Sequence, residues 1–350
     1  MRNVLNFITS IIPPIALAAC VENVIPTEDP PVLQCEGADY TAFDVENHAQ
    51  QDVRVAGFTQ MKTLLEAAVE TPAAAATKFE AAAAIYADAG AMSATVQGRT
   101  DDHLDNAPLV GDGIDARIDA ALSAGAAATT ALEAELATES IDKAMTEFFF
   151  LSVFHGLVQG QAASWDEAFG DYGAAVDNDL DGVQSIAAVA KRRDDDNGTA
   201  FEASIFQSLA EGSCVLATRL AELDTDAIDA RNDPELSTII DDIDTAMRQV
   251  LALSAGHEAT EIGELQAELL ATPGDVDLQG SARVKLVELD GFFRPLERLL
   301  RAEGDSVTAD ALRTPLAIAL ADTTAAWIDT FDSAAIIATL EAKFVVDVVR

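Results

Sequence analysis

The sequence predicts an all-α protein folded as a helical bundle, and three observations support this prediction. Strong helix formers, above all Ala, Leu and Glu, dominate the chain from about residue 44 onward. Apolar residues recur there at the three- and four-residue spacing of amphipathic helices, and no segment shows a convincing strand pattern. Glycine and proline interrupt this spacing and leave segments of roughly 15–30 residues, which is the length of bundle helices.

Short proline- and glycine-containing stretches mark the expected helix boundaries. In the segment that begins at Pro234, Leu236, Ile240 and Ile243 fall near one helical face, which predicts that this face packs into the core. The boundaries lie at Thr71-Pro72, Gly98, 108–113, Asn197-Gly198, Asp233-Pro234, Pro273-Gly274, Gly304 and Thr314-Pro315.

The first nineteen residues have the layout of an export signal, with a positive charge at Arg2, an apolar run and small residues before Cys20. The run is shorter than the roughly 20 residues that a membrane-spanning helix needs. The string Leu17-Ala18-Ala19-Cys20 resembles the bacterial lipobox, in which the cysteine becomes the lipid-modified first residue of the mature protein. The alternative is an ordinary signal peptide cleaved after Ala18. Val21 follows the cysteine, which by resemblance to Gram-negative lipoproteins implies the outer membrane, facing the periplasm or the cell surface.

The expected domain organisation follows from this layout. A weak internal similarity around Trp165 and Trp327 is consistent with a duplicated helical unit, although chance explains so few matches nearly as well. The expected parts are a lipoprotein signal peptide (1–19), a lipid-anchored acidic, proline-rich tether (20–40), and an all-helical domain (41–350) with candidate halves 41–195 and 199–350.

The charge of the chain restricts its partners. It has 60 acidic against 21 basic residues and a formal net charge of −39. Such a domain is a poor ligand for nucleic acid or for anionic membrane surfaces, so the only membrane contact we expect is the lipid on Cys20. The acidic surface either gathers cations or serves solubility alone.

Two further cysteines lie beyond the expected anchor. In an oxidising envelope Cys35 and Cys214 could form a disulfide between the tether and the bundle. Alternatively, Cys214 is a small buried residue and Cys35 a free thiol. Sequence separation does not determine the Cα distance that a disulfide requires.

One acidic stretch resembles the opening of a calcium loop. Asp177, Asp179 and Asp181 alternate before a glycine, and the carbonyl of Val183 would add a ligand. The twelfth position is Ala188, so the bidentate glutamate of an EF-hand is missing. An acidic, solvated turn is the competing interpretation.

The aromatic residues of this aromatic-poor chain concentrate between residues 147 and 173. Carboxylates at the rim of an aromatic pocket are one interpretation. A capping box from Ser164 to Glu167, with a helix beginning at Trp165, is the other. The pocket candidates are His155, Trp165, Asp166, Glu167 and Asp171.

The string Trp165-Asp-Glu-Ala-Phe-Gly170 resembles a segment of bacterial lipoproteins allied to the imelysin-like proteins. That resemblance implies an all-helical envelope protein associated with iron. The Gly-x-His-x-x-Glu metal motif of that family has its nearest counterpart around His257, with Ala255 and Thr260 in place of the glycine and glutamate. His257 and Glu261 would still share a helical face, so a metal site that includes them is a hypothesis.

The sequence favours a binding module over an enzyme, with calcium or iron as the candidate ligand. It contains no serine elbow, no His-Glu-x-x-His pair, no phosphate-binding glycine loop and no Cys-x-x-Cys. Two alternatives stay open: a metal-dependent hydrolase of the imelysin peptidase type, and a structural acidic envelope protein without a small ligand.

Overall fold

The computed structural model describes Cys35 and residues 47–173, 183–322 and 326–349, all within one compact unit that comprises residues 34–350. This unit is a bundle of α-helices, which confirms the predicted all-α class. Its described residues form no β-strand, only an isolated bridge between Thr100 and Leu109. None of the described helices combines the length and apolar character needed to cross a membrane. The predicted signal peptide (1–19) and Cys20 lie outside the described residues, as does the tether apart from Cys35.

The helices follow one another through short connections. The first six are α1 (Ala49–Glu70), α2 (Ala75–Asp88), α3 (Met92–Gln97), α4 (Gly111–Ala126), α5 (Ala131–Val158) and α6 (Ala162–Tyr172). They are followed by α7 (Ile186–Asn197), α8 (Phe201–Leu223), α9 (Pro234–Ala271), α10 (Val276–Ala302), α11 (Ser306–Ala321) and α12 (Ser333–Phe344). Short 3₁₀ turns occur at η2 (Pro72–Ala74), η3 (Ala89–Ala91) and η4 (Ala326–Asp329).

Most predicted boundaries coincide with helix ends, and one does not. The helix α7 ends at Gly198 in the left-handed conformation, and Asp233 caps α9 by accepting backbone hydrogen bonds. The boundary predicted at Thr314-Pro315 is wrong, because α11 continues through Pro315. Leu312 and Leu316, on either side of this proline, are both buried, so packing of the apolar face holds the helix together there.

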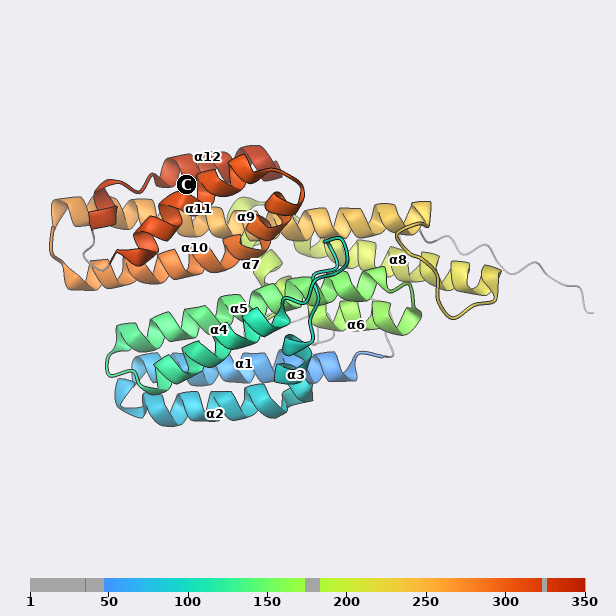
Figure 1. Cartoon of the computed structure of the whole chain (residues 1–350), viewed down its shortest axis with the longest axis horizontal. Coiled ribbons are helices and arrows are strands. Elements are labelled where there is room, and N and C mark those ends of the chain that lie inside the picture. Colours follow the sequence, from blue (N-terminus) through green and yellow to red (C-terminus); the bar gives the residue numbers. More distant parts are fainter. Residues whose placement is uncertain (1–34, 36–46, 174–182, 323–325, 350) are drawn as a thin grey trace, which may run out of the picture. The chain divides into compact units, whose positions relative to one another are not determined.

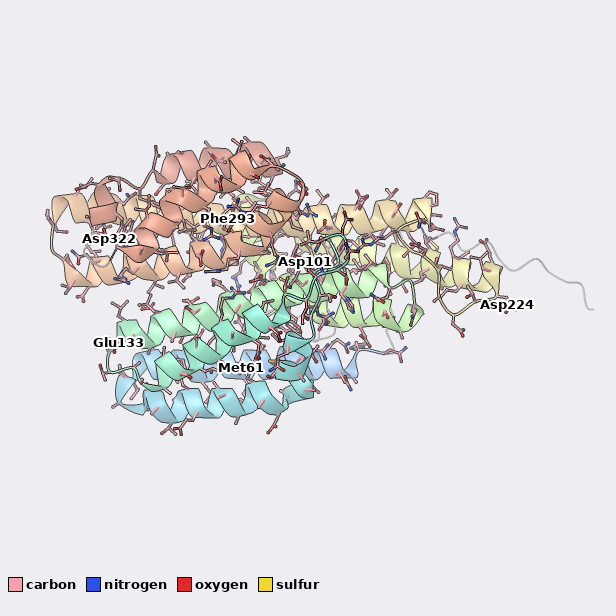
Figure 2. The ribbon with its side chains drawn as sticks, viewed as in Figure 1. Met61, Asp101, Glu133, Asp224, Phe293 and Asp322 are labelled. Atoms are coloured by element: carbon pink, nitrogen blue, oxygen red, sulfur yellow. A yellow bond between two sulfur atoms is a disulfide. The ribbon has the colours of Figure 1, made fainter. Side chains whose placement is uncertain are left out.

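The helix α5 lies at the centre of the bundle. Figure 1 shows α1, α2, α4 and α5 together, α9 to α12 together, and α5 beside α10. Every residue of α5 from Ile141 to Phe154 is buried, and a helix buried on all sides is a core element. The aromatic-rich part of the sequence is therefore mostly core. Met61 of α1 and Phe293 of α10, labelled in Figure 2, are buried on the two sides of α5.

The close approach of α5 and α10 requires a glycine. A Cβ atom at Gly291 would lie 2.2 Å from the Cβ of Lys143, far inside van der Waals contact. The backbone of α10 at Gly291 therefore packs directly against α5 at Lys143. This contact determines the geometry of the polar cavity described below.

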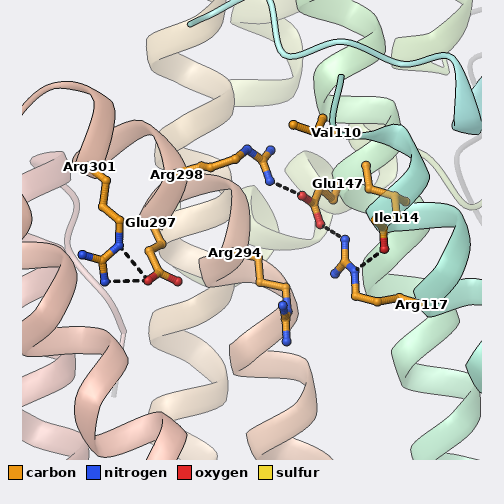
Figure 3. A pocket seen from close by; sticks show the side chains of 9 residues that line it. Val110, Ile114, Arg117, Glu147, Arg294, Glu297, Arg298 and Arg301 are labelled. Carbon is orange, nitrogen blue, oxygen red and sulfur yellow. Dashed lines mark hydrogen bonds and ion pairs between the residues drawn. The ribbon is translucent and has the colours of Figure 1, made fainter. Parts of the chain in front are cut away.

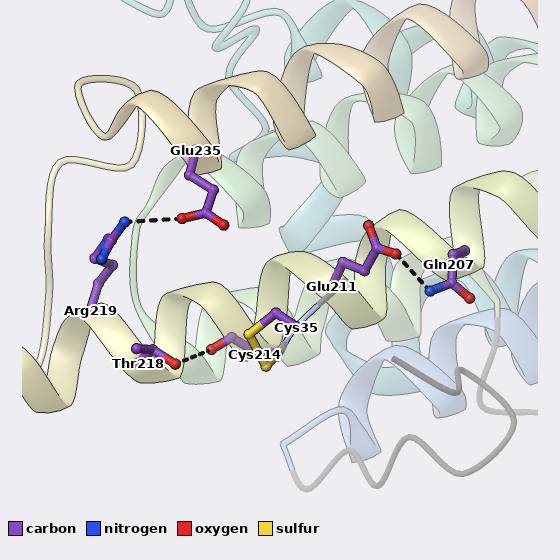
Figure 4. The surroundings of a disulfide bond; sticks show 7 residues. All are labelled: Cys35, Gln207, Glu211, Cys214, Thr218, Arg219 and Glu235. Atoms are coloured by element: carbon purple, nitrogen blue, oxygen red, sulfur yellow. Dashed lines mark hydrogen bonds and ion pairs between the residues drawn. A yellow bond between two sulfur atoms is a disulfide. The ribbon is translucent and has the colours of Figure 1, made fainter. Parts of the chain in front are cut away.

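A disulfide joins the segment before α1 to α8. Cys35 is bonded to Cys214, with the two Cα atoms 5.5 Å apart (Figure 4). Of the two states that the sequence left open for these cysteines, the structure therefore has the bonded one. The two cysteines are 179 positions apart in the sequence, so the bond restricts the unfolded chain over a long loop.

The connection between α3 and α4 is held to α9 by His103 and to α10 by Asp101. Its Nδ1 lies 2.8 Å from Asp101 Oδ1 and its Nε2 lies 2.9 Å from Asp244 Oδ1. Asp101, labelled in Figure 2, also accepts a hydrogen bond from Arg298, and Asp244 pairs with Arg248. Burial, the largest single effect, lowers the pKa of His103, but the two aspartates together outweigh it and raise that pKa above 6.5.

We therefore expect the stabilisation that His103 gives the domain to be lost as the pH rises above about 6.5, the ordinary pKa of histidine. A histidine whose folded pKa exceeds its unfolded value stabilises the fold fully below the unfolded pKa, and this contribution is lost as the pH rises through the folded pKa. Urea denaturation at several pH values measures the effect. In His103→Gln the free energy of unfolding should depend less on pH over this range, and an unchanged dependence would contradict the assignment.

Candidate functional site

A polar cavity of about 290 Å³ lies among α1, α5, α7, α9 and α10. We call it the central cavity. Its wall is dominated by ionisable side chains of both signs, which is unusual for a site enclosed by five helices. The ionisable lining residues are Lys62, Glu66, Glu139, Asp142, Lys143, Arg192, Arg193, His257, Glu258, Lys285 and Glu288.

Three residues of α9 bring potential metal ligands together at this cavity. One nitrogen of His257 and one carboxylate oxygen each from Glu258 and Glu261 all lie within 4.8 Å of one another. The Nε2 atom of His257 is 3.5 Å from Glu261 Oε1, as expected for residues one helical turn apart. Glu258 is buried, and the other two residues are half-buried.

The side chain of Lys285 on α10 enters this group from the opposite wall. Its Nζ lies 2.6 Å from Glu261 Oε2, 3.1 Å from Glu258 Oε2 and 3.3 Å from Glu288 Oε2. The ammonium group of Lys285 is thus a cation shared by three carboxyl groups in this structure. The position is suited to positive charge, whether it is carried by lysine or by a metal ion.

The pKa values of Glu258 and Glu288 are shifted in opposite directions. Burial, followed by the neighbouring Glu288, raises the pKa of Glu258 to about 8. For Glu288 burial also acts to raise the pKa, but Lys143, a hydrogen bond with Glu258 and Lys285 together lower it. Burial and then Arg193 lower the pKa of His257, so its imidazole is neutral at pH 7. A neutral imidazole is the form that binds metal.

On the α5 side of the cavity, two lysines and two carboxylates form a second cluster. Lys143 Nζ lies 2.6 Å from Asp142 Oδ2 and 3.1 Å from Glu139 Oε2. Lys62 Nζ lies 2.8 Å from Glu139 Oε1 and 3.5 Å from Asp142 Oδ2. Burial opposes ionisation of Asp142, but Lys143 and then Lys62 lower its pKa well below the ordinary value. The two lysines and two carboxylates of this cluster are ion-paired with one another, so the cluster as a whole carries no net charge.

The structure describes the predicted His257–Glu261 site in full but only one of the four predicted ligands of the calcium loop. Asp177, Asp179 and Asp181 lie outside the described residues, so the calcium loop stays a prediction. Val183 is described, and its side chain is buried against the core. His257, in contrast, lines the central cavity, and Glu261 lies one helical turn further along α9, with its Oε1 3.5 Å from His257 Nε2.

The aromatic-pocket candidates occupy separate environments. Trp165 is fully buried in the core, where its indole N–H donates to the carbonyl of Leu209 at 2.9 Å. Buried Asp171 pairs with Arg54 at 3.1 Å. The capping box predicted at Ser164 is wrong, because α6 begins earlier, at Ala162, and Ser164 lies inside it.

The polar candidates of that stretch likewise have other neighbours. Asp166 accepts a hydrogen bond from the side chain of Asn47 at 3.1 Å, and Glu167 is exposed. The Nδ1 atom of His155 contacts a carboxylate oxygen of Asp102, so His155 does not extend the His257 group. None of these five candidates lines the central cavity.

The sequence analysis missed Glu258, Lys285 and Glu288. Glu258 directly follows His257, and the i, i+3 pair of Lys285 and Glu288 marks one face of α10. Neither pattern stands out in a chain with 60 acidic residues. Only the packing of α9 against α10 makes these residues a site.

Comparisons of this chain with models of protein families, with curated proteins and with solved structures found no match.

Proposed function

We propose that this chain is a metal-binding envelope lipoprotein, in which His257, Glu258 and Glu261 bind a divalent transition-metal ion. The observation that carries the proposal is the convergence of one imidazole nitrogen and two carboxylate oxygens within 4.8 Å at a polar cavity. The sequence resemblance to imelysin-like proteins points to the same helix. The lipid anchor on Cys20 and the outer-membrane location belong to the proposal and rest on the lipobox-like string.

The ligand types favour iron(II) or zinc over calcium at this site. Imidazole nitrogen combined with carboxylate suits first-row transition metals, whereas calcium prefers six to eight oxygen ligands. Glu288 on α10 also contacts the Lys285 ammonium, so its carboxylate could be a further ligand for a metal ion at that position. A metal ion would take the place of the Lys285 ammonium, whose long stem allows the group to withdraw.

Thermal melting of the chelator-treated, lipid-free domain, at fixed ionic strength and without oxygen, tests this proposal. We expect a saturable rise in melting temperature with iron(II) or zinc, equivalent to about 2.7 kcal/mol when the free metal is 100 times its dissociation constant. His257→Ala and Glu261→Gln should each weaken binding at least tenfold. Glu264→Gln, which changes an exposed carboxylate on the same helix, should leave binding unchanged and serves as the matched control.

Lys285→Gln gives the most specific outcome. If the ammonium competes with the metal, this variant should be less stable than the parent in chelator and should bind iron(II) or zinc more tightly. Equal metal responses in the parent, His257→Ala and Glu264→Gln would reject the site. A rise with calcium that disappears in Asp179→Ala would instead assign binding to the aspartate loop.

A further inference from the structure

A second cavity, of about 450 Å³, is lined by arginines from α4 and α10. We call it the arginine pocket; Figure 3 shows it from close by. Four of the chain's 21 basic residues line it, and the carboxylates in its wall are Glu147 and Glu297. The lining arginines are Arg117, Arg294, Arg298 and Arg301.

Each of the four arginines pairs with at least one carboxylate that is less exposed than its own side chain, whereas the second partner of Arg301, Asp310, is exposed over 64 %. Glu147, whose side chain is 1 % exposed, is bound by both Arg117 and Arg298, whose side chains are 30 % and 27 % exposed. Arg294 pairs with Asp290 and is exposed over 42 % of its side chain, whereas Asp290 is exposed over only 11 %. These acids therefore hold the arginines in place, while each arginine side chain stays 27–42 % exposed.

The pocket has more hydrogen-bond donors than acceptors. Each guanidinium carries five N–H groups, so the four arginines have more donors than Glu147 and Glu297 can accept, although they also donate to other acceptors. These further acceptors are Asp101, Asp290, Asp310 and the carbonyl of Gly113. The Nη2 group of Arg298 is buried and has no hydrogen-bond partner in this structure. The chain has a net charge of −39, so four arginines beside two glutamates in the wall of one cavity are an unusual local concentration of basic residues.

We propose that the arginine pocket binds a compact multivalent oxyanion, of the phosphate or oligocarboxylate class. Planar guanidinium groups bind both kinds of oxygen pair through two parallel hydrogen bonds. Donors from both α4 and α10 line this one cavity, which fits a ligand with at least two anionic groups, because a monovalent ion would use only part of the wall. The arginine pocket shares α5 and α10 with the central cavity but no lining residue, so this proposal is independent of the proposed metal site.

Isothermal titration of the metal-free domain with pyrophosphate and with citrate, at ionic strength matched with sodium chloride, tests the proposal. We expect saturable binding of at least one anion, weakened tenfold or more in the double variant Arg294→Gln/Arg301→Gln. Both arginines are more than 40 % exposed, so the variant should keep its fold, which circular dichroism can verify. Arg219→Gln is the matched control, because Arg219 pairs with three carboxylates away from the pocket.

The two probes distinguish the source of the anion. Binding of pyrophosphate alone assigns phosphate chemistry, and binding of citrate alone assigns carboxylate chemistry. Absence of saturable binding for both anions overturns the proposal. Binding that persists unchanged in the double variant, or that falls equally in Arg219→Gln, overturns it as well.

Discussion

Replacing Lys143 by leucine is expected to lower the free energy of unfolding by about 3 kcal/mol, near the lower end of the range for breaking a buried ion pair. Lys143 is buried, and its ammonium lies 2.6 Å from the carboxylate of Asp142. Without it, a buried aspartate would lose its closest cation. Lys62, at 3.5 Å from Asp142, compensates for only part of that loss.

Urea denaturation at pH 7 measures this effect, and two further variants make it specific. Lys191→Leu removes an exposed lysine that pairs with Asp195, so it should change stability by less than about 0.5 kcal/mol. The double variant Lys143→Leu/Asp142→Leu should recover most of the loss, because it leaves no unpaired buried charge. A loss below about 1 kcal/mol in Lys143→Leu would show that the central cavity is hydrated enough to solvate Asp142.

Trp165→Ala is expected to lower the free energy of unfolding by about 3–5 kcal/mol, as large-to-small core substitutions do. The Trp165 side chain is fully buried and donates to the carbonyl of Leu209 on α8. Its ring fills the space left by a glycine, since a Cβ atom at Gly212 would lie 2.2 Å from Trp165 Cζ2. Alanine would leave a cavity between α6 and α8 and a carbonyl without its donor.

The same denaturation assay separates this role from a binding role. Trp165→Phe should lower the free energy of unfolding by less than Trp165→Ala does, because a ring still fills the space although the hydrogen bond is lost. Leu223→Ala, at an exposed apolar residue of α8, should be nearly neutral and serves as the control. If Trp165→Ala were as stable as the parent protein, the residue would not be a core anchor, and the pocket interpretation of this stretch would regain support.

The core positions also show where sequence patterns mislead. The segment 147–173 was interpreted partly as an aromatic pocket because its composition differs from the rest of the chain. The structure buries its aromatic residues in the core, on α5 and α6. Pro315 misled in a related way, because proline disfavours a helix locally, whereas burial of Leu312 and Leu316 stabilises α11 through tertiary packing.

The sequence by itself determined the all-α class and most helix ends, because helix propensity, amphipathic spacing and capping act over a few neighbouring residues. It also singled out His257 and Glu261, which are one turn apart on a single helix. Only the tertiary structure decided what surrounds them. Lys285 and Glu288 reach the site because α10 packs against α9, and Lys143 reaches the same cavity because Gly291 lets α5 approach α10. Such contacts depend on side-chain fit between distant segments, which no local pattern records.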